Sequence, residues 1–217
     1  MLCPKCATQL PELTAACPKC GFCAAEVDNV LGNQAATIEP IMDVAACLRL
    51  ADRNKLEALL DDFERRFPQV HIALFVGVLP PPLTPATAGF WLLNHGVRIK
   101  HGKRRDNAMG ILILIEPTSG QAGISLGYGL ETLLPTSSLT AALQAATHHL
   151  QHANFGAAFR SIVRAIDRLI RKAATSRARG APFVPVTPKP HHVPLGLPQH
   201  ITRPAQLPPK QVKEEVW

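Results

Sequence analysis

The sequence predicts an α/β protein, a three-layer α/β/α sandwich that follows a small cysteine-rich segment. Two continuous apolar runs, "VHIALFVGVL" and "MGILILIE", have the composition of strands that are buried on both faces. Amphipathic helical patterns precede, separate and follow these runs. A mixed sheet covered by helices on both faces would bury all of these apolar surfaces together.

Two Cys-x-x-Cys pairs stand at the start of the chain. Cys3 and Cys6 form the first pair, and Cys17 and Cys20 form the second. Two such pairs can place four thiolates at the corners of one tetrahedron, which is a closed structural zinc site without an open position for catalysis. Metal binding also supplies folding free energy that so short a segment cannot obtain from burial. We therefore expect residues 1–23 to form a zinc ribbon, with a source of stability separate from that of the following domain.

The other interpretations of the cysteines are weaker. A reducing cytosol would not keep disulfides between these pairs, and no βαβ unit surrounds them as in a thioredoxin-like motif. Cys23 is at ligand spacing from Cys20 and is a spare or exchangeable ligand, whereas Cys47 lies in an apolar context and is expected to be an inert core thiol. The segment resembles the short zinc ribbon at the N-terminus of many bacterial proteins, which implies a binding or spacing module.

The first helices of the body have clear boundaries. One is expected to begin near Asp52 and to end before Pro68, because its apolar side chains repeat at i, i+3, i+4 and i+7. The next should have Thr84 as its N-cap and Pro85 at its first position, and Gly96 can end it.

The order of the remaining elements predicts the sheet topology. Because a helix separates the two buried runs, they should be parallel neighbours joined by a right-handed crossover. After the turn "PTSGQ", the run "AGISLGYG" should return as a strand of a hairpin. Two helices should end the fold, one from about Ser138 to Ala153 and one whose apolar stripe begins at Phe155 and reaches Ile170.

Charge and proline content divide the chain further. The formal net charge is +7, and residues 171–217 contain eight basic and two acidic residues, so most of the basicity belongs to the C-terminal segment. Because prolines recur there and lack an amide donor, residues 173–217 are expected to be a basic, mostly disordered tail. Residues 24–37 read as a polar linker. The longest apolar run is far shorter than the roughly 18 residues of a membrane span, and no secretory signal is recognisable, so we expect a soluble cytoplasmic protein without membrane insertion.

Several motifs in residues 38–172 resemble the TPM-domain family, which includes bacterial envelope proteins, a thylakoid-lumen phosphatase and a photosystem II repair factor. They are "IMDVAACL", "LEALLDDFERRFPQVHIALFV", the Asp-Asn pair before "GILILI", "LGYGLE" and "NFGAAFRSIVRAI", in this order. The resemblance implies a Rossmann-like α/β/α sandwich, in agreement with the pattern of apolar residues.

Acidic residues flank the predicted hairpin. Asp106 and Asn107 precede one strand and Glu131 follows the other, so we expect them at one edge of the sheet, where open α/β sheets bind ligands. Asp43 matches an acidic position of the family near that edge. Oxygen ligands suit calcium or magnesium, and the resemblance implies a divalent cation site in some members. Alternatively, Asp106 and Asn107 cap a turn. The segment 135–137 has Pro-Thr-Ser where many relatives have an aspartate, which removes one candidate ligand.

Three further patterns have structural explanations. The glycines of "GYG" at residues 127–129 do not continue into a dinucleotide loop, and they allow a sharp bend and a close approach of backbones. The basic loop "RIKHGKRRD" is read as a solvated mobile loop, with anion attraction as the alternative. His148, His149 and His152 are assigned to the polar outer face of a helix.

No nucleophile is paired with a base, so no catalytic residue is predicted. The chain is expected to be a non-catalytic cytoplasmic adaptor, in which the ribbon and the TPM-like domain present surfaces to a protein partner and the tail serves as a tether. The alternative is a divalent-metal-dependent acid phosphatase-like hydrolase using Asp106 and Glu131, as the plant relatives imply. Nucleic-acid binding through the ribbon and tail is a third class, and its affinity would fall steeply with salt.

Overall fold

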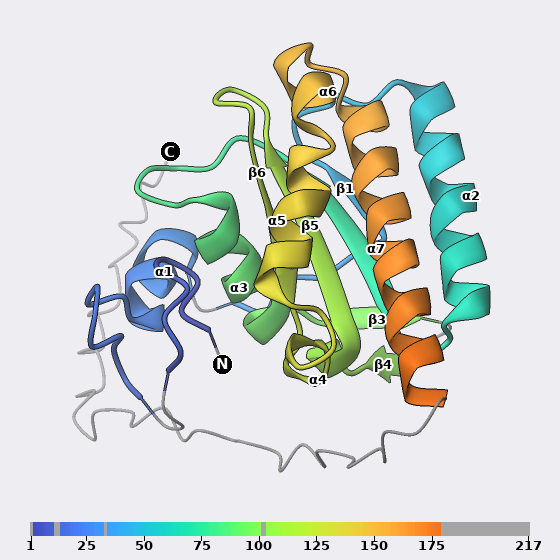
Figure 1. The fold of residues 1–217 in the computed structure, drawn as a ribbon. Coiled ribbons are helices and arrows are strands. Elements are labelled where there is room, and N and C mark those ends of the chain that lie inside the picture. The colour runs from blue at the N-terminus through green and yellow to red at the C-terminus, as the bar shows by residue number, and fades with distance from the viewer. Residues whose placement is uncertain (1, 11–13, 33, 101–102, 179–217) are drawn as a thin grey trace, which may run out of the picture. The chain divides into compact units, whose positions relative to one another are not determined.

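The structure, a computed structural model, describes residues 2–10, 14–32, 34–100 and 103–178. Its centre is a four-stranded sheet with the order β1-β2-β5-β6 (Figure 1). The strands are β1 (Ile41–Asp43), β2 (His71–Val76), β5 (Gly110–Glu116) and β6 (Gln121–Leu126). β2 runs parallel to both β1 and β5, while β6 is antiparallel to β5. The predicted parallel pair and the predicted hairpin are both confirmed.

Helices lie on both faces of this sheet. The longer ones are α1 (Ala24–Leu31), α2 (Leu50–Arg66), α3 (Pro85–His95), α5 (Thr136–Gln144), α6 (Thr147–Gln151) and α7 (Phe155–Ala178). The short elements are β3 (Arg98–Lys100), β4 (Lys103–Arg105), the 3-10 helix η1 (Asn107–Met109) and α4 (Tyr128–Glu131). α2, α5 and α7 cover one face, α3 covers the other, and α1 packs beside α3 (Figure 1). The layers are those of the predicted α/β/α sandwich.

The burial of the central strand β5 on both faces explains why its sequence is apolar without alternation. All seven of its residues are buried. Ile111, Ile113 and Ile115 contribute to the large core shared with α2 and α7, whereas Leu112 packs with Leu93 in the layer under α3. A strand covered by helices on both faces has no side that favours polar residues.

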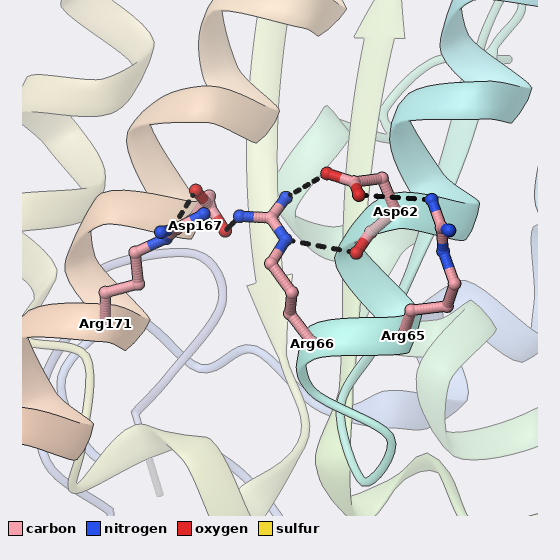
Figure 2. A network of polar contacts seen from close by, with 5 residues as sticks. All are labelled: Asp62, Arg65, Arg66, Asp167 and Arg171. Atoms are coloured by element: carbon pink, nitrogen blue, oxygen red, sulfur yellow. Dashed lines mark hydrogen bonds and ion pairs between the residues drawn. The ribbon is translucent and has the colours of Figure 1, made fainter.

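Ion pairs join α2 to α7 at the outer surface of the helical layer (Figure 2). Arg66 lies between two carboxylates, 2.7 Å from Asp62 and 2.8 Å from Asp167. Asp62 also pairs with Arg65 at 3.2 Å, and Asp167 with Arg171 at 3.0 Å. The hydrogen bond to Asp167 is the main reason that the pKa of Arg66 lies above its usual value. The network fixes the C-terminal half of α2 against α7.

The structure departs from the predicted elements in three places. The expected linker contains α1, whose Val27 is buried against Trp91, and the expected loop contains the antiparallel hairpin of β3 and β4. The predicted helix 138–153 is divided into α5 and α6 around Ala145 and Ala146.

The C-terminal boundary also differs from the prediction. The last helix continues to Ala178, six residues into the expected tail. The remaining tail, residues 179–217, lies outside the described residues. In the part of the chain that the structure describes, no helix has the length and apolar character to cross a membrane.

Candidate metal centre and its contact with α3

Four cysteine sulfurs converge at the N-terminus, as predicted. The Sγ atoms of Cys3 and Cys20 are 3.6 Å apart, and so are those of Cys6 and Cys17. All four ligand atoms lie within 4.8 Å of one another. A tetrahedron with zinc–sulfur bonds of about 2.3 Å has edges of about 3.8 Å, whereas a disulfide would be about 2.05 Å. The geometry fits a metal ion such as zinc, and all four thiols are free.

The two cysteine knuckles are folded in the same way. In each, the first cysteine donates its amide to a carbonyl five residues later, Cys3 to Thr8 and Cys17 to Phe22. In each, the same cysteine accepts a hydrogen bond from the fourth residue after it, which has a positive φ: 55° at Ala7 and 72° at Gly21. These turns bring both thiols of a pair to one side of the backbone. The sequence spacing alone was therefore sufficient to predict the cluster.

The thiols experience different local fields. The Thr8 hydroxyl and then its backbone lower the pKa of Cys6 to about 6. The Phe22 amide acts in the same direction on Cys20, but burial and the neighbouring thiols outweigh it and raise the pKa of Cys20 to about 12. A bound cation would favour the thiolate form of all four cysteines.

The metal centre is not a separate unit, because its cysteines share an apolar cluster with α3. Cys3 and Cys17 are buried together with Trp91, which is 4% exposed. Phe22 of the second knuckle meets Phe90 of α3 edge to face, with ring centroids 6.0 Å apart. The ribbon and the α/β domain therefore stabilise each other by burial, which the prediction of two independent sources of stability did not include.

Polar contacts complete this junction. The Trp91 indole donates a hydrogen bond of 2.8 Å to Asp28 of α1. Asp28 also lies 3.5 Å from His95, whose ring stacks on Trp91 at a centroid distance of 4.9 Å. Sequence reasoning missed this contact, although "FWLL" within α3 was a usable signal. Four consecutive apolar residues cannot all face the sheet, so a second partner was required.

Of the two other cysteines, neither belongs to the metal cluster. Cys23 precedes α1 as its N-cap residue, and its role as an alternative ligand stays a prediction. Cys47 is partly buried against the main core, as expected. Burial, followed by the charge of Asp43, raises the pKa of Cys47.

Asp43 ends β1 and folds the loop that follows it. Its Oδ1 accepts the Cys47 amide at 2.8 Å, and its Oδ2 accepts the Leu48 amide at 2.9 Å. Asp43 is paired with Val76 at the carboxyl end of the parallel strands, whereas Gly110, four residues after Asp106, is paired with the first residue of β2. Asp43 therefore lies at the opposite end of the sheet from Asp106, contrary to the prediction.

The other acidic candidates meet near the amino end of β5. Asp106 accepts the Ala108 amide at 2.8 Å and caps η1, while the Asn107 amide group donates to carbonyls at the end of α3. Glu131 is in α4, which packs on η1, and burial raises its pKa while the Leu2 amide acts against this shift. These three residues share one end of the sheet, as predicted, but it is the amino end of β2 and β5 and not the carboxyl end, where open α/β sheets bind ligands. The capping of a turn is confirmed for Asp106. Calcium or magnesium binding by them stays a prediction.

A buried polar group at the same end of the sheet was not predicted. His71 and Arg98 are 3% and 4% exposed. Arg98 pairs with Glu64 at 3.2 Å and donates to the Ile72 carbonyl at 3.4 Å. Burial, together with the charges of Arg98 and Arg105, lowers the pKa of His71 to about 4. Arg98 thus connects the basic hairpin of β3 and β4 to the core. The sequence did not indicate this contact, because Arg98 belongs to a basic run that was interpreted as a solvated loop.

The lowered pKa of His71 predicts acid sensitivity. A histidine in the unfolded chain takes up a proton near pH 6.5, but folded His71 does so only near pH 4. The free energy of unfolding should be unaffected by this residue above pH 6.5 and should fall by up to about 3 kcal/mol as the pH decreases from 6.5 to 4. Urea unfolding at several pH values would measure this, and His71→Gln should remove that part of the slope. The exposed His148→Gln is the matched control, and an equal slope in His71→Gln and the parent would contradict the prediction.

His148 and His149 of α6 and His152, its C-cap residue, are on the outer side of the helix, as predicted. His148 and His152 are exposed and His149 is partly exposed. The rings of His148 and His152 lie 4.4 Å apart, and His152 Nδ1 is 2.8 Å from the His148 carbonyl. Within the described residues, the four cysteines are the group whose ligand atoms converge as a metal site requires.

Comparisons with known proteins identify the α/β domain. The family profile described as the TPM domain matches residues 41–169. Three structures determined by NMR are similar. The N-terminal domain of a P. gingivalis protein has 17% identity and a TM-score of 0.49, and the match covers 63% of this chain and 85% of that chain. The N-terminal domain of cg2496 from Corynebacterium glutamicum has 18% identity and a TM-score of 0.47, and the match covers 60% of this chain and 78% of that chain. BA42 from Bizionia argentinensis has 11% identity and a TM-score of 0.49, and the match covers 60% of this chain and 86% of that chain. No curated protein matches the chain.

Proposed function

Because the chain belongs to the TPM-domain family, we propose that it is a non-catalytic interaction protein in which a structural zinc ribbon is anchored on α3 of a TPM domain. The ribbon would enlarge and stiffen the surface of the domain on the side of α3. Zinc is the metal proposed, since four thiolates at tetrahedral spacing are a preferred ligand set for it and leave no open coordination position.

The use of the acidic residues supports a non-catalytic role. Both carboxylate oxygens of Asp43 accept backbone amides of the loop after β1, and Asp106 accepts the amide of Ala108. These hydrogen bonds give each aspartate a structural role that requires no bound ion. Asp43 is also at the opposite end of the sheet from Asp106 and Glu131, so it cannot join these two residues in one metal site.

A reducing compartment, the cytoplasm, is part of the proposal. Cys3, Cys6, Cys17 and Cys20 are free thiols, and Cys23 is a fifth free thiol close to them in sequence. An oxidising compartment would favour disulfides among these residues, whereas a reducing one keeps them available as zinc ligands.

A phosphatase assay separates the proposal from its alternative. The purified chain should not hydrolyse a model phosphomonoester above background with calcium, with magnesium or without either ion. Asp106→Ala is the test variant for the alternative, and Thr132→Ala, an exposed position near the same edge, is its control. Metal-dependent hydrolysis that is lost in Asp106→Ala and retained in Thr132→Ala would overturn the non-catalytic proposal and assign a hydrolase.

A further inference from the structure

The outer side of α7 has more cationic side chains than the nearby carboxylates neutralise. Asp52 of α2 is paired with Arg160 at 2.6 Å. Asp167 is shared between Arg66 and Arg171. Each of these two carboxylates is therefore already held by arginine.

Arg164 and Arg168 of this helix differ from Arg160 and Arg171 in their contacts. In the described part of the chain, Arg164 and Arg168 have no carboxylate partner, and both are exposed. They follow Arg160 at intervals of four residues, so the three side chains form a row with a rise of about 6 Å per step. Lys55 of α2 is exposed beside this row and also has no carboxylate partner among the described residues.

Two hollows lie along the row of arginines. The first, of about 430 Å³, is lined by residues of α6 and α7: His149, Ala157, Arg160, Ser161, Arg164 and Arg168. The second, of about 540 Å³, lies between α2 and α7 and is lined by Lys55, Ala58, Leu59, Asp62, Arg160 and Arg164. Arg160 and Arg164 belong to both hollows. α7 stands between α6 and α2 in the helical layer (Figure 1).

Each hollow combines apolar and cationic groups. Ala157 contributes apolar surface to the first, and Ala58 and Leu59 contribute it to the second. The one carboxylate among the lining residues, Asp62, is held by two arginines and adds little net negative charge. A ligand that complements both hollows therefore has apolar groups to bury and several negative charges around them.

We infer that this row and its two hollows bind an acidic, amphipathic segment of a protein partner. The inference rests on the proposed interaction function and names the chemistry of the partner. Guanidinium groups form bidentate hydrogen bonds with carboxylates, so Arg164 and Arg168 fit Asp or Glu side chains spaced about one helical turn apart. Apolar side chains between these acids would enter the hollows. A bare phosphate chain satisfies the charges but has nothing to place on Leu59 and the alanines.

Selection from a random dodecapeptide library on the immobilised full chain tests this inference. Enriched peptides should contain Leu, Phe or similar residues flanked by Asp or Glu. Their affinity should fall about tenfold or more when Arg164→Ala and Arg168→Ala are combined, because two desolvated charge pairs are lost. Neither arginine has a carboxylate partner among the residues that the structure describes, so the variant should unfold like the parent, and its thermal melt verifies this.

The matched control is Lys172→Ala, a loss of charge at an exposed position of α7 that lines neither hollow. It should change the affinity of the same peptides less than twofold. Equal losses in the control and in the arginine variant would show attraction to net charge alone and would overturn the inference. Enriched peptides that lack acidic residues, or whose affinity is the same for the parent and both variants, would also overturn the inference.

Linear polyphosphate and a short DNA duplex are the competitors. If either binds more tightly than the selected peptides and depends on Arg164 and Arg168, the surface recognises phosphate and the inference is wrong. Failure here is distinct from failure of the proposed function. If the chain hydrolyses no phosphomonoester and the selected peptides bind away from this row, the inference fails but the proposed interaction function stands. Metal-dependent hydrolysis overturns the proposed function, whichever surface the peptides bind.

Discussion

Replacing Cys17 with serine is expected to abolish metal binding and to release the ribbon from α3. The ribbon depends on metal ligation for folding free energy, and Cys17 and Trp91 are buried in one cluster. Trp91 should therefore become solvated, with a shift of its fluorescence to longer wavelength. The α/β domain should lose about 2 kcal/mol of unfolding free energy, since an aromatic side chain loses its apolar cover.

Fluorescence can be assigned to Trp91 in a Trp217→Phe background, because the chain has two tryptophans. Cys47→Ser is the control, since Cys47 is a free cysteine that packs on the other core. It should keep its zinc and the emission of the parent. Chelation of the parent should reproduce the spectrum of Cys17→Ser. Unchanged Trp91 emission after complete loss of zinc would contradict the packing of the ribbon on α3.

Gly127→Ala is expected to be the most destabilising single substitution in the hairpin region. A Cβ at this position would lie 2.6 Å from the Ala108 carbonyl carbon and closer still to the carbonyl oxygens of Asn107 and Ala108. These are backbone atoms of η1 and cannot move aside as a flexible side chain can. The Gly127 amide also donates to Gly110 at 2.8 Å, which holds the end of β6 against the start of β5.

The expected loss is about 3 kcal/mol or more of unfolding free energy, measured by urea titration. Thr132→Ala, an exposed substitution five residues later, should change stability by less than about 0.5 kcal/mol. A value for Gly127→Ala within about 1 kcal/mol of the parent would mean that η1 can move away from the strand, and it would contradict the close approach described here.

The main layers were predictable because strong local signals agreed with the global packing. Thr84 caps α3 with a reciprocal hydrogen-bond pair to Thr87, as the Thr-Pro sequence indicated. The uninterrupted apolar run of β5 showed that helices cover both of its faces, and the cysteine spacing showed which sulfurs converge. Each of these features depends on residues that are close together in sequence.

The missed features depend on contacts between distant segments. The bond from Trp91 to Asp28 and the pair of Arg98 with Glu64 join residues that no local pattern connects. The position of Asp43 was misjudged because β1 has only three residues and gives no clear strand signal. Without β1, the direction of the sheet at Asp43 could not be derived from the sequence.

The central claim is a closed four-cysteine zinc site that anchors the ribbon on α3. X-ray absorption at the zinc edge of the purified full chain tests this zinc site most directly. The account predicts one zinc per chain with four sulfur neighbours at about 2.3 Å and no oxygen or nitrogen ligand. A chain purified under reducing conditions that contains no zinc, or a zinc ion with oxygen or nitrogen in its first coordination shell, would contradict it.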